Sequence, residues 1–390
     1  MITFDNTQIA FESKSDKDLK RAYRLFKLIG NRSLVKIGKP LTNISLKMGL
    51  PIKGIIRNTI FAQFCGGETI NQCENTINEL GKFGIGTILD YSVEGKTSDE
   101  DFEHTTNEII ATILKGKSNS NIPFAVFKIT GISRFELLEK ANISLDKFTA
   151  SEQKEYVQLI ERVDRICKMG FDNNIPVFID AEETWIQDAI DHIAYEMMLK
   201  YNKERAIVYN TVQMYRHDRL VYLKNEINRV KKDNIKYGVK LVRGAYMEKE
   251  RSRALEKGYP SPIQKDKKSC DEDYDAALEF LVSELEFMAL CAGSHNEASS
   301  LFLTELLSKF NVSPSDERIY FAQLLGMSDH ISYNLSKLGY NVAKYVPFGP
   351  IKEVMPYLLR RADENTSVAG QTSRELGLII KERQRRSQAK

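Results

Sequence analysis

Cysteine and histidine are scarce in this sequence, with five of each among 390 residues. The cysteines are odd in number and widely scattered: Cys65, Cys73, Cys167, Cys270 and Cys291. No C-x-x-C pair and no Cys/His cluster with zinc spacing occurs, which argues against a zinc module or a disulfide framework. We therefore interpret the cysteines as reduced thiols of a cytosolic protein.

Long apolar runs are also missing. No stretch approaches the ~20 apolar residues that are needed to span a bilayer. The N-terminal segment has no basic region followed by an apolar run, and it carries Asp5 and Glu12, which are unusual in a transit peptide. We expect a cytoplasmic protein that is at most peripheral at the inner face of a membrane.

The sequence has no strong excess of charge of one sign. The formal net charge is only +3, with 42% hydrophobic and 28% charged residues, as is typical of a soluble globular protein with a sizeable core. Nothing in this balance indicates nucleic acid as a partner. The basic residues are spread out except for the run at residues 381–386, and such a run usually marks a solvated helix end.

What is present is a helical start followed by an alternation of strand and helix patterns. Residues 17–29 and 69–80 place apolar side chains on one helix face. Eight short apolar runs then alternate with longer amphipathic stretches, at residues 86–91, 123–129, 176–180, 206–213, 239–244, 288–293, 319–324 and 341–346. Nearly continuous apolar strands indicate burial on both faces, as in a parallel sheet covered by helices.

Eight such units predict a (β/α)8 barrel of the TIM type, an α/β fold. We place the barrel at residues 83–370, after an N-terminal helical arm at residues 1–82 and before a C-terminal helical tail at residues 371–390. A doubly wound open sheet is disfavoured, because no G-x-G-x-x-G follows the first strand.

Polar side chains gather where the apolar runs end. They comprise Asp90 and Glu94 at the first run, Lys128 at the second, Asp180, Glu182 and Glu183 at the third, Gln213 and Tyr215 at the fourth, Lys240, Arg243 and Tyr246 at the fifth, Ser294, His295 and Asn296 at the sixth, and Tyr345 at the eighth. Singly, each has a structural explanation: Asp180 or Asn296 can cap a helix, and Lys128 can lie along the surface. Together they indicate a site, since barrel chemistry lies at the carboxyl ends of the strands.

The last helix of the barrel carries adjacent arginines, Arg360 and Arg361, followed one turn later by Glu364. A lone Arg-Arg pair is usually solvated. Here the pair follows the rigid turn at residues 347–350, and Glu364 can pair with either arginine. Two guanidinium groups over a barrel mouth suit bidentate capture of a small carboxylate.

Several of these motifs resemble the proline dehydrogenase family: residues 180–183, 240–246 and 294–296, and Tyr345 together with residues 360–365. The resemblance spans roughly residues 84–366, and several motifs in one order are far more specific than a lone pattern. Residues 64–68 and 90–95 look more like the monofunctional, eukaryotic-type branch than like the barrel of the bifunctional bacterial proline utilisation protein.

The resemblance implies a flavoenzyme that uses FAD to oxidise L-proline to Δ1-pyrroline-5-carboxylate and passes the electrons to a membrane quinone. It assigns Arg360 and Arg361 to the substrate carboxylate, with Glu94 pairing with the first arginine when the site closes. It places Lys128 and Asp180 beside the substrate, and Leu241, Tyr246, Leu325 and Tyr345 against its ring. The positions at or near the flavin are Gln213, Lys240, Val242, Arg243, Gly244, Ala245, His295, Asn296 and Glu364. It implies no metal ligand.

Two departures from the bacterial bifunctional proteins stand out. Lys240 occupies the place of an arginine near flavin N5, which keeps the positive charge but loses the bidentate contact. Met247 occupies the place of a tryptophan, which keeps an apolar wall. Tyr345 is bulky and disfavours 4-hydroxyproline, so proline is the expected substrate.

Other functions are left open at this point. They are a hydroxyproline dehydrogenase, a Schiff-base lyase that uses Lys128 or Lys240, a flavin barrel of the methylenetetrahydrofolate reductase kind, and a non-catalytic proline-responsive regulator. The sequence indicates neither the oligomeric state nor the ligands of the FAD phosphates.

Overall fold

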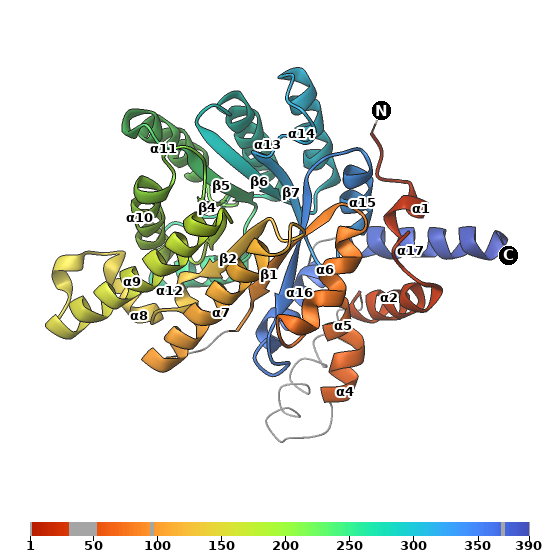
Figure 1. Cartoon of the computed structure of the whole chain (residues 1–390), viewed down its shortest axis with the longest axis horizontal. Coiled ribbons are helices and arrows are strands. Elements are labelled where there is room, and N and C mark those ends of the chain that lie inside the picture. The colour runs from red at the N-terminus through yellow and green to blue at the C-terminus, as the bar shows by residue number, and fades with distance from the viewer. Residues whose placement is uncertain (1, 31–52, 94–96, 368–370, 390) are drawn as a thin grey trace. The chain divides into compact units, whose positions relative to one another are not determined.

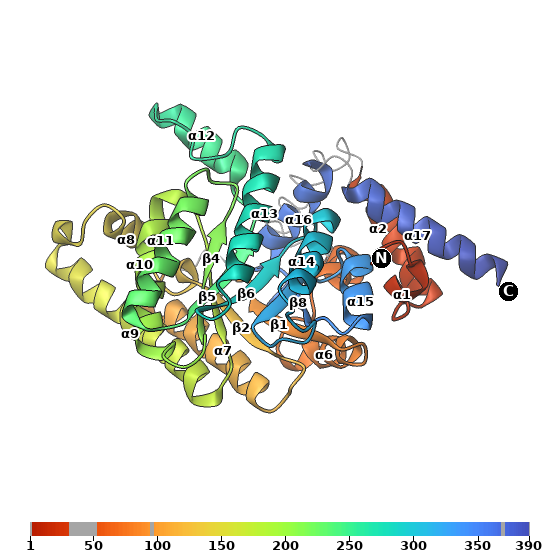
Figure 2. The same cartoon turned by 90° about the horizontal axis from the view of Figure 1, so that it is seen from above.

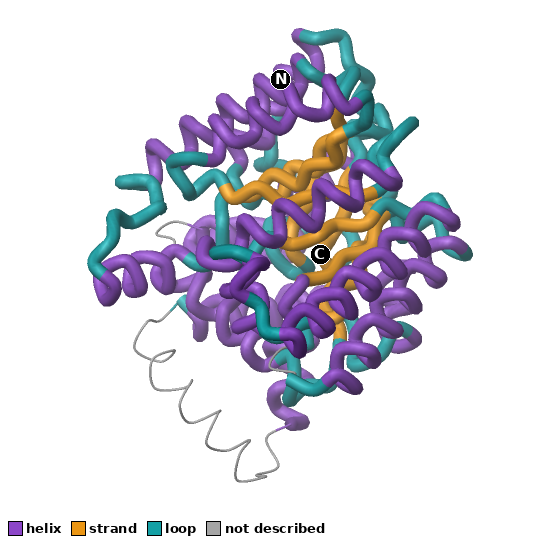
Figure 3. Tube along the Cα trace, turned by 90° about the vertical axis from the view of Figure 1, so that its left-hand side faces the viewer, coloured by secondary structure: helices purple, strands orange, loops and turns teal. Residues whose placement is uncertain are grey.

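The structure, a computed structural model, describes residues 2–30, 53–93, 97–367 and 371–389. Eight parallel strands form a closed barrel in the order β1 to β8 (Figures 1 and 3). Their bounds are β1 Ile85–Tyr91, β2 Phe124–Lys128, β3 Val177–Asp180, β4 Val208–Gln213, β5 Tyr237–Val242, β6 Met288–Gly293, β7 Ile319–Leu324 and β8 Val342–Phe348. The expected (β/α)8 barrel is confirmed, and each of the eight apolar runs overlaps one of the strands.

The chain divides into two compact units, residues 1–94 with 323–390 and residues 95–322. The first unit holds β1 and β8, the second holds β2 to β6, and β7 is divided between them. The boundaries expected at residues 82 and 370 separate an N-terminal arm and a C-terminal tail from the barrel. They do not correspond to the division into compact units, and they stay a prediction.

The helices of the first unit come from both ends of the chain. They are α1 Thr7–Ala10, α2 Asp16–Ile29, α4 Lys53–Ile56, the π-helical turn η1 Arg57–Phe61, α5 Ala62–Phe64, the 3-10 turn η2 Asn71–Cys73, α6 Glu74–Gly81, α15 Asp329–Lys337, α16 Met355–Ser367 and α17 Gln371–Gln388. The start of α2 is set by a capping box, in which Ser15 accepts from the amide of Asp18 while the Asp18 carboxylate accepts from that of Ser15.

The helices of the second unit follow the strands in turn. They are α7 Asp99–Lys117, the 3-10 turn η3 Ile129–Gly131, α8 Phe135–Ala141, the 3-10 turn η4 Leu145–Lys147, α9 Ala150–Asn173, α10 Thr184–Tyr201, α11 Arg219–Asp233, α12 Met247–Lys257, α13 Lys267–Ser283 and α14 Glu297–Lys309. None of the helices within the described ranges is both long and apolar enough to cross a membrane.

Burial follows the pattern expected from the apolar runs. Every residue of β4 and of β8 is buried, as required of strands covered on both faces. Within the second unit, aromatic rings from four strands pack on one another: Phe124 stacks on Phe178 with ring centroids 4.4 Å apart, and it meets Tyr320 edge-on at 4.7 Å. Tyr209 closes the group at 5.2 Å from Phe178. The strands thus surround a packed interior rather than a channel.

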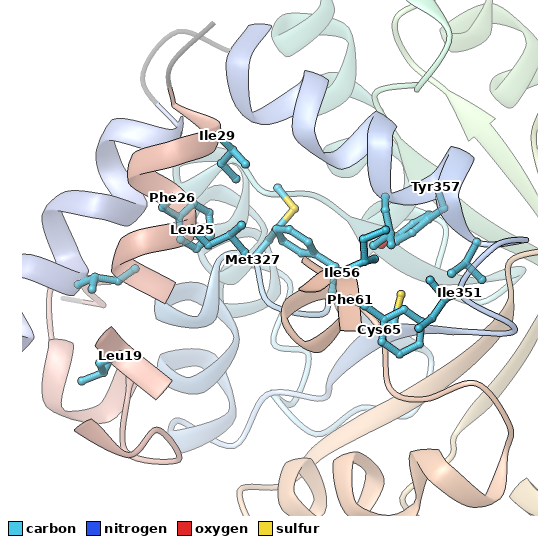
Figure 4. Packing of buried hydrophobic residues seen from close by; sticks show 14 of the residues in the cluster. Leu19, Leu25, Phe26, Ile29, Ile56, Phe61, Cys65, Met327, Ile351 and Tyr357 are labelled. Carbon is cyan, nitrogen blue, oxygen red and sulfur yellow. The ribbon is translucent and has the colours of Figure 1, made fainter. Parts of the chain in front are cut away.

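The first unit has its own apolar core (Figure 4). It combines residues of α2, such as Phe26, with residues of η1 and α5, such as Phe61, and with Tyr357 and Leu358 of α16. Figure 4 shows Phe61 and Cys65 beside Ile351 and Tyr357. The apolar face of α16 is therefore fixed by the N-terminal helices of the same unit.

Candidate active site

A charge cluster lies at the carboxyl ends of strands β2 and β3. Lys128 is the last residue of β2 and Asp180 the last of β3, and the Lys128 Nζ is 3.5 Å from the Asp180 Oδ2. Lys240, on β5, forms an ion pair with the other oxygen of Asp180 and lies 5.8 Å above the ring of Phe178. Asp180 is therefore no helix cap, and Lys128 is no surface lysine.

The electrostatics of this cluster are dominated by its two ammonium groups. Burial opposes the charge of the Asp180 carboxylate, but the ammonium of Lys240 and then that of Lys128 outweigh burial, and together they hold the pKa of Asp180 below its usual value. Within this cluster, two ammonium groups face one carboxylate. Such an arrangement suits an anionic or neutral ligand group better than a further cation.

A second carboxyl group, that of Glu182, lies two residues after Asp180 and binds the turn that follows β2. The Glu182 Oε1 accepts from the backbone amide of Thr130 at 3.0 Å, and its other oxygen accepts from the Thr130 hydroxyl. Thr130 lies two residues after Lys128, so Glu182 fixes the turn into which β2 runs. Burial raises the pKa of Glu182 to about 7. Sequence patterns placed Glu182 at the rim but did not reveal this role.

The predicted flavin residue Gln213 is oriented by the same segment. Its Nε2 donates to the backbone carbonyl of Glu182 at 2.7 Å. This bond determines which branch of the amide is the donor and which is the acceptor, so the side chain of Gln213 has one defined orientation.

Arg243 follows β5 and has a partner for each of its three nitrogens. Its Nε pairs with Asp271 at 2.7 Å, its other nitrogens donate to the hydroxyls of Ser294 and Ser299 at 2.9 Å, and its guanidinium lies 4.3 Å from the ring centroid of Tyr274. Among these partners, Asp271 and Ser299 lie on α13 and α14, and no sequence motif marked them. The guanidinium is half-buried and held in one position.

The backbone that follows Arg243 can be built only with glycine. Gly244 has φ of +136°, and a Cβ at this position would stand 2.6 Å from the ring of Tyr215. Gly244 and Ala245 are exposed, which leaves their backbone open to close approach by a ligand.

The other predicted residues of the second unit lie as follows. Leu241 is buried, and Val242, Tyr246 and His295 are half-buried. The side chain of Asn296 accepts from the amides of Ala298 and Ser299 and caps α14. For Asn296, the structural alternative considered from sequence is therefore observed.

In the first unit, Tyr345 and Leu325 are neighbours. Tyr345 lies on β8 and is buried, and its carbonyl accepts from the amide of Leu325 at 2.8 Å. The adjacent Lys344 is fully buried on the same strand, where its Nζ pairs with Asp329 at 2.8 Å. The ion pair anchors β8 to the start of α15 and was not expected from sequence.

The two arginines of α16 are not a fully solvated pair. Arg361 is only 7% exposed, and its guanidinium lies 4.9 Å from the ring centroid of Tyr357, while Arg360 is half-buried. Two further residues predicted from the sequence, Glu94 and the side chain of Glu364, lie outside the described residues.

The arm motif at residues 64–68 holds the turn that leads to α16. The amide of Gly66 donates to the carbonyl of Pro347 at 2.9 Å, and the amide of Gly349 donates to that of Gly67 at 3.2 Å. The Glu68 carboxylate accepts from the amide of Ile351 at 3.3 Å. The motif is therefore structural: it sets the path from β8 to the two arginines.

Comparison with known proteins agrees with this geometry. The family model described as proline dehydrogenase matches residues 73–374. The chain is 33% identical to proline dehydrogenase 1, mitochondrial, of Dictyostelium discoideum, over 98% of this chain and 74% of that protein. It is 38% identical to the human protein of the same name, over 62% of this chain and 41% of that protein.

Among solved structures, proline utilization A from Bdellovibrio bacteriovorus, inactivated by N-propargylglycine, matches with a TM-score of 0.74 at 19% identity. The match covers 94% of this chain and 39% of that chain, so the present chain spans well under half of the length of that protein. At this level of identity the likeness shows the fold.

The expectation of a cytoplasmic protein is contradicted by these relatives, since the Dictyostelium and human proteins are both named as mitochondrial. Reduced thiols exclude an oxidising compartment but do not choose between the reducing ones, and this is why the inference failed. The family model covers most of the chain, the Dictyostelium relative aligns with nearly all of it, and the fold is similar to that of a proline utilization protein. The chain belongs to the proline dehydrogenase family, a family of oxidoreductases.

Proposed function

We propose that this chain oxidises L-proline to Δ1-pyrroline-5-carboxylate with FAD as cofactor and a membrane quinone as the final acceptor. The observation that carries the proposal is the cluster of Lys128, Asp180 and Lys240 at the strand ends. Its two ammonium groups suit a substrate that is an anion at one end and reacts as a neutral amine at the other.

Binding of the substrate carboxylate falls to Arg360 and Arg361. A guanidinium matches a carboxylate with two parallel hydrogen bonds and stays charged at all relevant pH values. Stacking on Tyr357 restricts the motion of Arg361, so little side-chain freedom is lost when a carboxylate binds. Binding energy at this end positions the reacting end of the ring.

The ring itself is proposed to lie against Leu241, Tyr246, Leu325 and Tyr345. Tyr345 is buried and its strand is pinned by the neighbouring Lys344–Asp329 pair. A rigid phenol against the ring leaves little room for a hydroxyl substituent, which favours proline over 4-hydroxyproline.

The strand ends of the second unit fit a flavin. Arg243 presents a fixed guanidinium, Gly244 permits close approach of the backbone, and Gln213 presents an amide of defined orientation. Together with Lys240 and His295, these residues would hold FAD, which when bound supplies the acceptor for the hydride of the substrate. Lys240 then provides positive charge beside the cofactor.

A Schiff-base lyase is less well supported. Lys128 and Lys240 both pair with Asp180. An ion pair stabilises the ammonium form, whereas Schiff-base formation requires the neutral amine.

The experiment is a product assay. Purified protein is mixed with L-proline and a soluble redox dye, and the product is trapped with o-aminobenzaldehyde. We expect a coloured adduct with proline and very little with glycine or alanine. Absence of the adduct, together with borohydride trapping of a lysine by a carbonyl compound, would contradict proline oxidation and support the Schiff-base lyase.

A further inference from the structure

Two helices of the first unit, α2 and α17, carry an excess of positive charge that the rest of the chain lacks. Together they contain ten Lys and Arg residues against four Asp and Glu residues. Their net charge is thus +6, in a chain whose total is only +3. The two helices pack against each other, and both contribute to the apolar core of the unit (Figures 1 and 2).

The basic residues of α2 lie on one side of the helix. Lys17, Lys20, Arg24 and Lys27 are spaced by three and four residues, which places them along one face, and all four are exposed. Leu28 falls in the same row and is 55% exposed. The opposite side, with Leu19, Phe26 and Ile29, is buried in the core.

On α17, the acidic residues are buried and several basic residues are exposed. Glu375 and Glu382 are buried. Glu382 binds Arg385 and Arg386, and Arg386 also donates to the carbonyls of Phe11 and Lys14, so this arginine anchors the helix. Lys381, Arg383 and Arg385 remain exposed, as does Ile380 at 36%.

The two rows meet at Tyr23. The guanidinium of Arg383 lies 4.7 Å from the Tyr23 ring centroid, and the Nζ of Lys27 lies 5.9 Å from it. The rows therefore form one surface, which we call the basic face: Lys17, Lys20, Arg24, Lys27, Lys381, Arg383 and Arg385, with Leu28 and Ile380. Among the described residues, the acidic groups at or beside it are Asp16, paired with Arg386, Asp18, engaged in the capping box, and the buried Glu382, whose carboxylate pairs with Arg385.

We propose that the basic face docks the protein on an anionic lipid surface. Lysine and arginine near such a surface each contribute to binding, and exposed apolar side chains among them enter the headgroup region. Leu28 and Ile380 favour lipid over nucleic acid, which offers such residues no apolar contact on its phosphate backbone. The inference rests on the proposed function in one respect: it locates the enzyme where a membrane quinone is available.

The test is vesicle flotation of the full-length protein. Vesicles contain phosphatidylcholine alone or phosphatidylcholine with a minority of phosphatidylglycerol. We expect binding only to the anionic vesicles and its loss near 1 M salt, where the Debye length is about 3 Å. The triple variant Lys17→Gln, Lys20→Gln, Arg24→Gln should bind on the order of 100-fold more weakly, since each basic residue contributes roughly fivefold.

A matched variant removes the same charge elsewhere. Lys154→Gln, Lys203→Gln and Lys232→Gln change three exposed lysines on or after α9, α10 and α11. This protein should bind anionic vesicles like the wild type. If both triple variants lose binding equally, net charge rather than the basic face is responsible, and the proposal is overturned.

Depth of insertion provides a second readout. All five native cysteines are buried, so Leu28→Cys can be labelled selectively with an environment-sensitive dye. Its emission should shift to the blue on anionic vesicles, whereas the same label at the comparably exposed Val221, introduced as Val221→Cys, should not respond. If the emission of the label at residue 28 did not shift, lipid docking would be refuted. It would also be refuted if the protein bound a DNA duplex but not vesicles, and if the α2 triple variant lost this DNA binding.

Activity with a soluble dye separates this inference from the proposed function. The α2 triple variant should oxidise proline with the dye at the wild-type rate, because none of its three positions is assigned to the active site. Inactivity of the wild type with the dye would count against proline oxidation and leave the vesicle result standing.

Discussion

The guanidinium of Arg361 lies 4.9 Å from the ring centroid of Tyr357, one turn earlier on α16. Arg361 is buried, although an arginine pair near a chain end is more often solvated. The stack orients a planar donor on a helix whose apolar face is locked into the core of its own unit.

The first prediction concerns this arginine. Arg361→Lys keeps the positive charge but loses the planar fork, so the KM for proline should rise about 10- to 100-fold, as expected for loss of a charge-assisted hydrogen bond. The kcat should fall less than the KM rises. Arg229→Lys is the control, since Arg229 stacks 3.4 Å from the Tyr195 ring on a helix with no assigned role; a KM effect of equal size there would contradict the assignment.

The second prediction concerns substrate choice at Tyr345. Tyr345→Ser opens space beside the ring, so the ratio of kcat/KM for 4-hydroxyproline to that for proline should rise. Steady-state kinetics with both substrates measures it. An unchanged ratio would refute the role of Tyr345 in selectivity, and near-UV circular dichroism checks that the barrel is intact.

The third prediction concerns pH. Burial raises the pKa of Glu182 from 4.5 to about 7, so the folded protein binds the proton more tightly than the unfolded chain does. Because the carboxyl pKa is raised, the contribution of Glu182 to the free energy of unfolding is greatest at low pH. This contribution falls as the pH rises from 4.5 to about 7. The wild type should lose about 3 kcal/mol over this window that the Glu182→Gln variant does not lose.

Urea unfolding at a series of pH values measures this difference. The urea midpoints of the two proteins should converge at the acidic end and separate toward neutral pH. If the urea midpoints of the two proteins changed in parallel with pH, the carboxyl pKa of Glu182 would not be raised in the folded protein.

The fourth prediction concerns the turn after β7. Gly326 has φ of +74°, and a Cβ there would stand 2.1 Å from the carbonyl oxygen of Gln63. Gly339 has φ of +83° with nothing within 4 Å. Gly326→Ala and Gly339→Ala share the left-handed strain, but only the first also forces the backbone apart, so it should lower the unfolding free energy by about 1–3 kcal/mol more.

Equal destabilisation by the two alanine substitutions, measured by thermal unfolding, would show that the close approach of Gln63 to Gly326 is absent. Reduced activity of Gly326→Ala at a temperature where it is folded would further link this turn to its neighbour Leu325.

Much of the fold could be predicted because apolar runs directly reflect burial. Each of the eight runs overlaps a strand, and the amphipathic stretches at residues 17–29 and 69–80 overlap α2 and α6. Strand ends also located Lys128 and Asp180, since neighbouring parallel strands bring their carboxyl ends together.

The partners of these residues could not be predicted. Lys240 pairs with Asp180 although it lies two strands away in the barrel order, and which inward side chains meet depends on register rather than on pattern. The bonds of Arg243 to Asp271 and Ser299 depend on how α13 and α14 pack. The role of residues 64–68 is carried by backbone hydrogen bonds, which side-chain patterns do not report.

The central claim is that this barrel transfers electrons from proline to a bound flavin. Anaerobic titration of the purified, flavin-loaded protein with L-proline, followed by absorbance, tests it most directly. We expect stepwise bleaching of the oxidised flavin band by proline and no bleaching by other amino acids. A flavin that stays oxidised under excess proline, or a protein that binds no flavin, would contradict it.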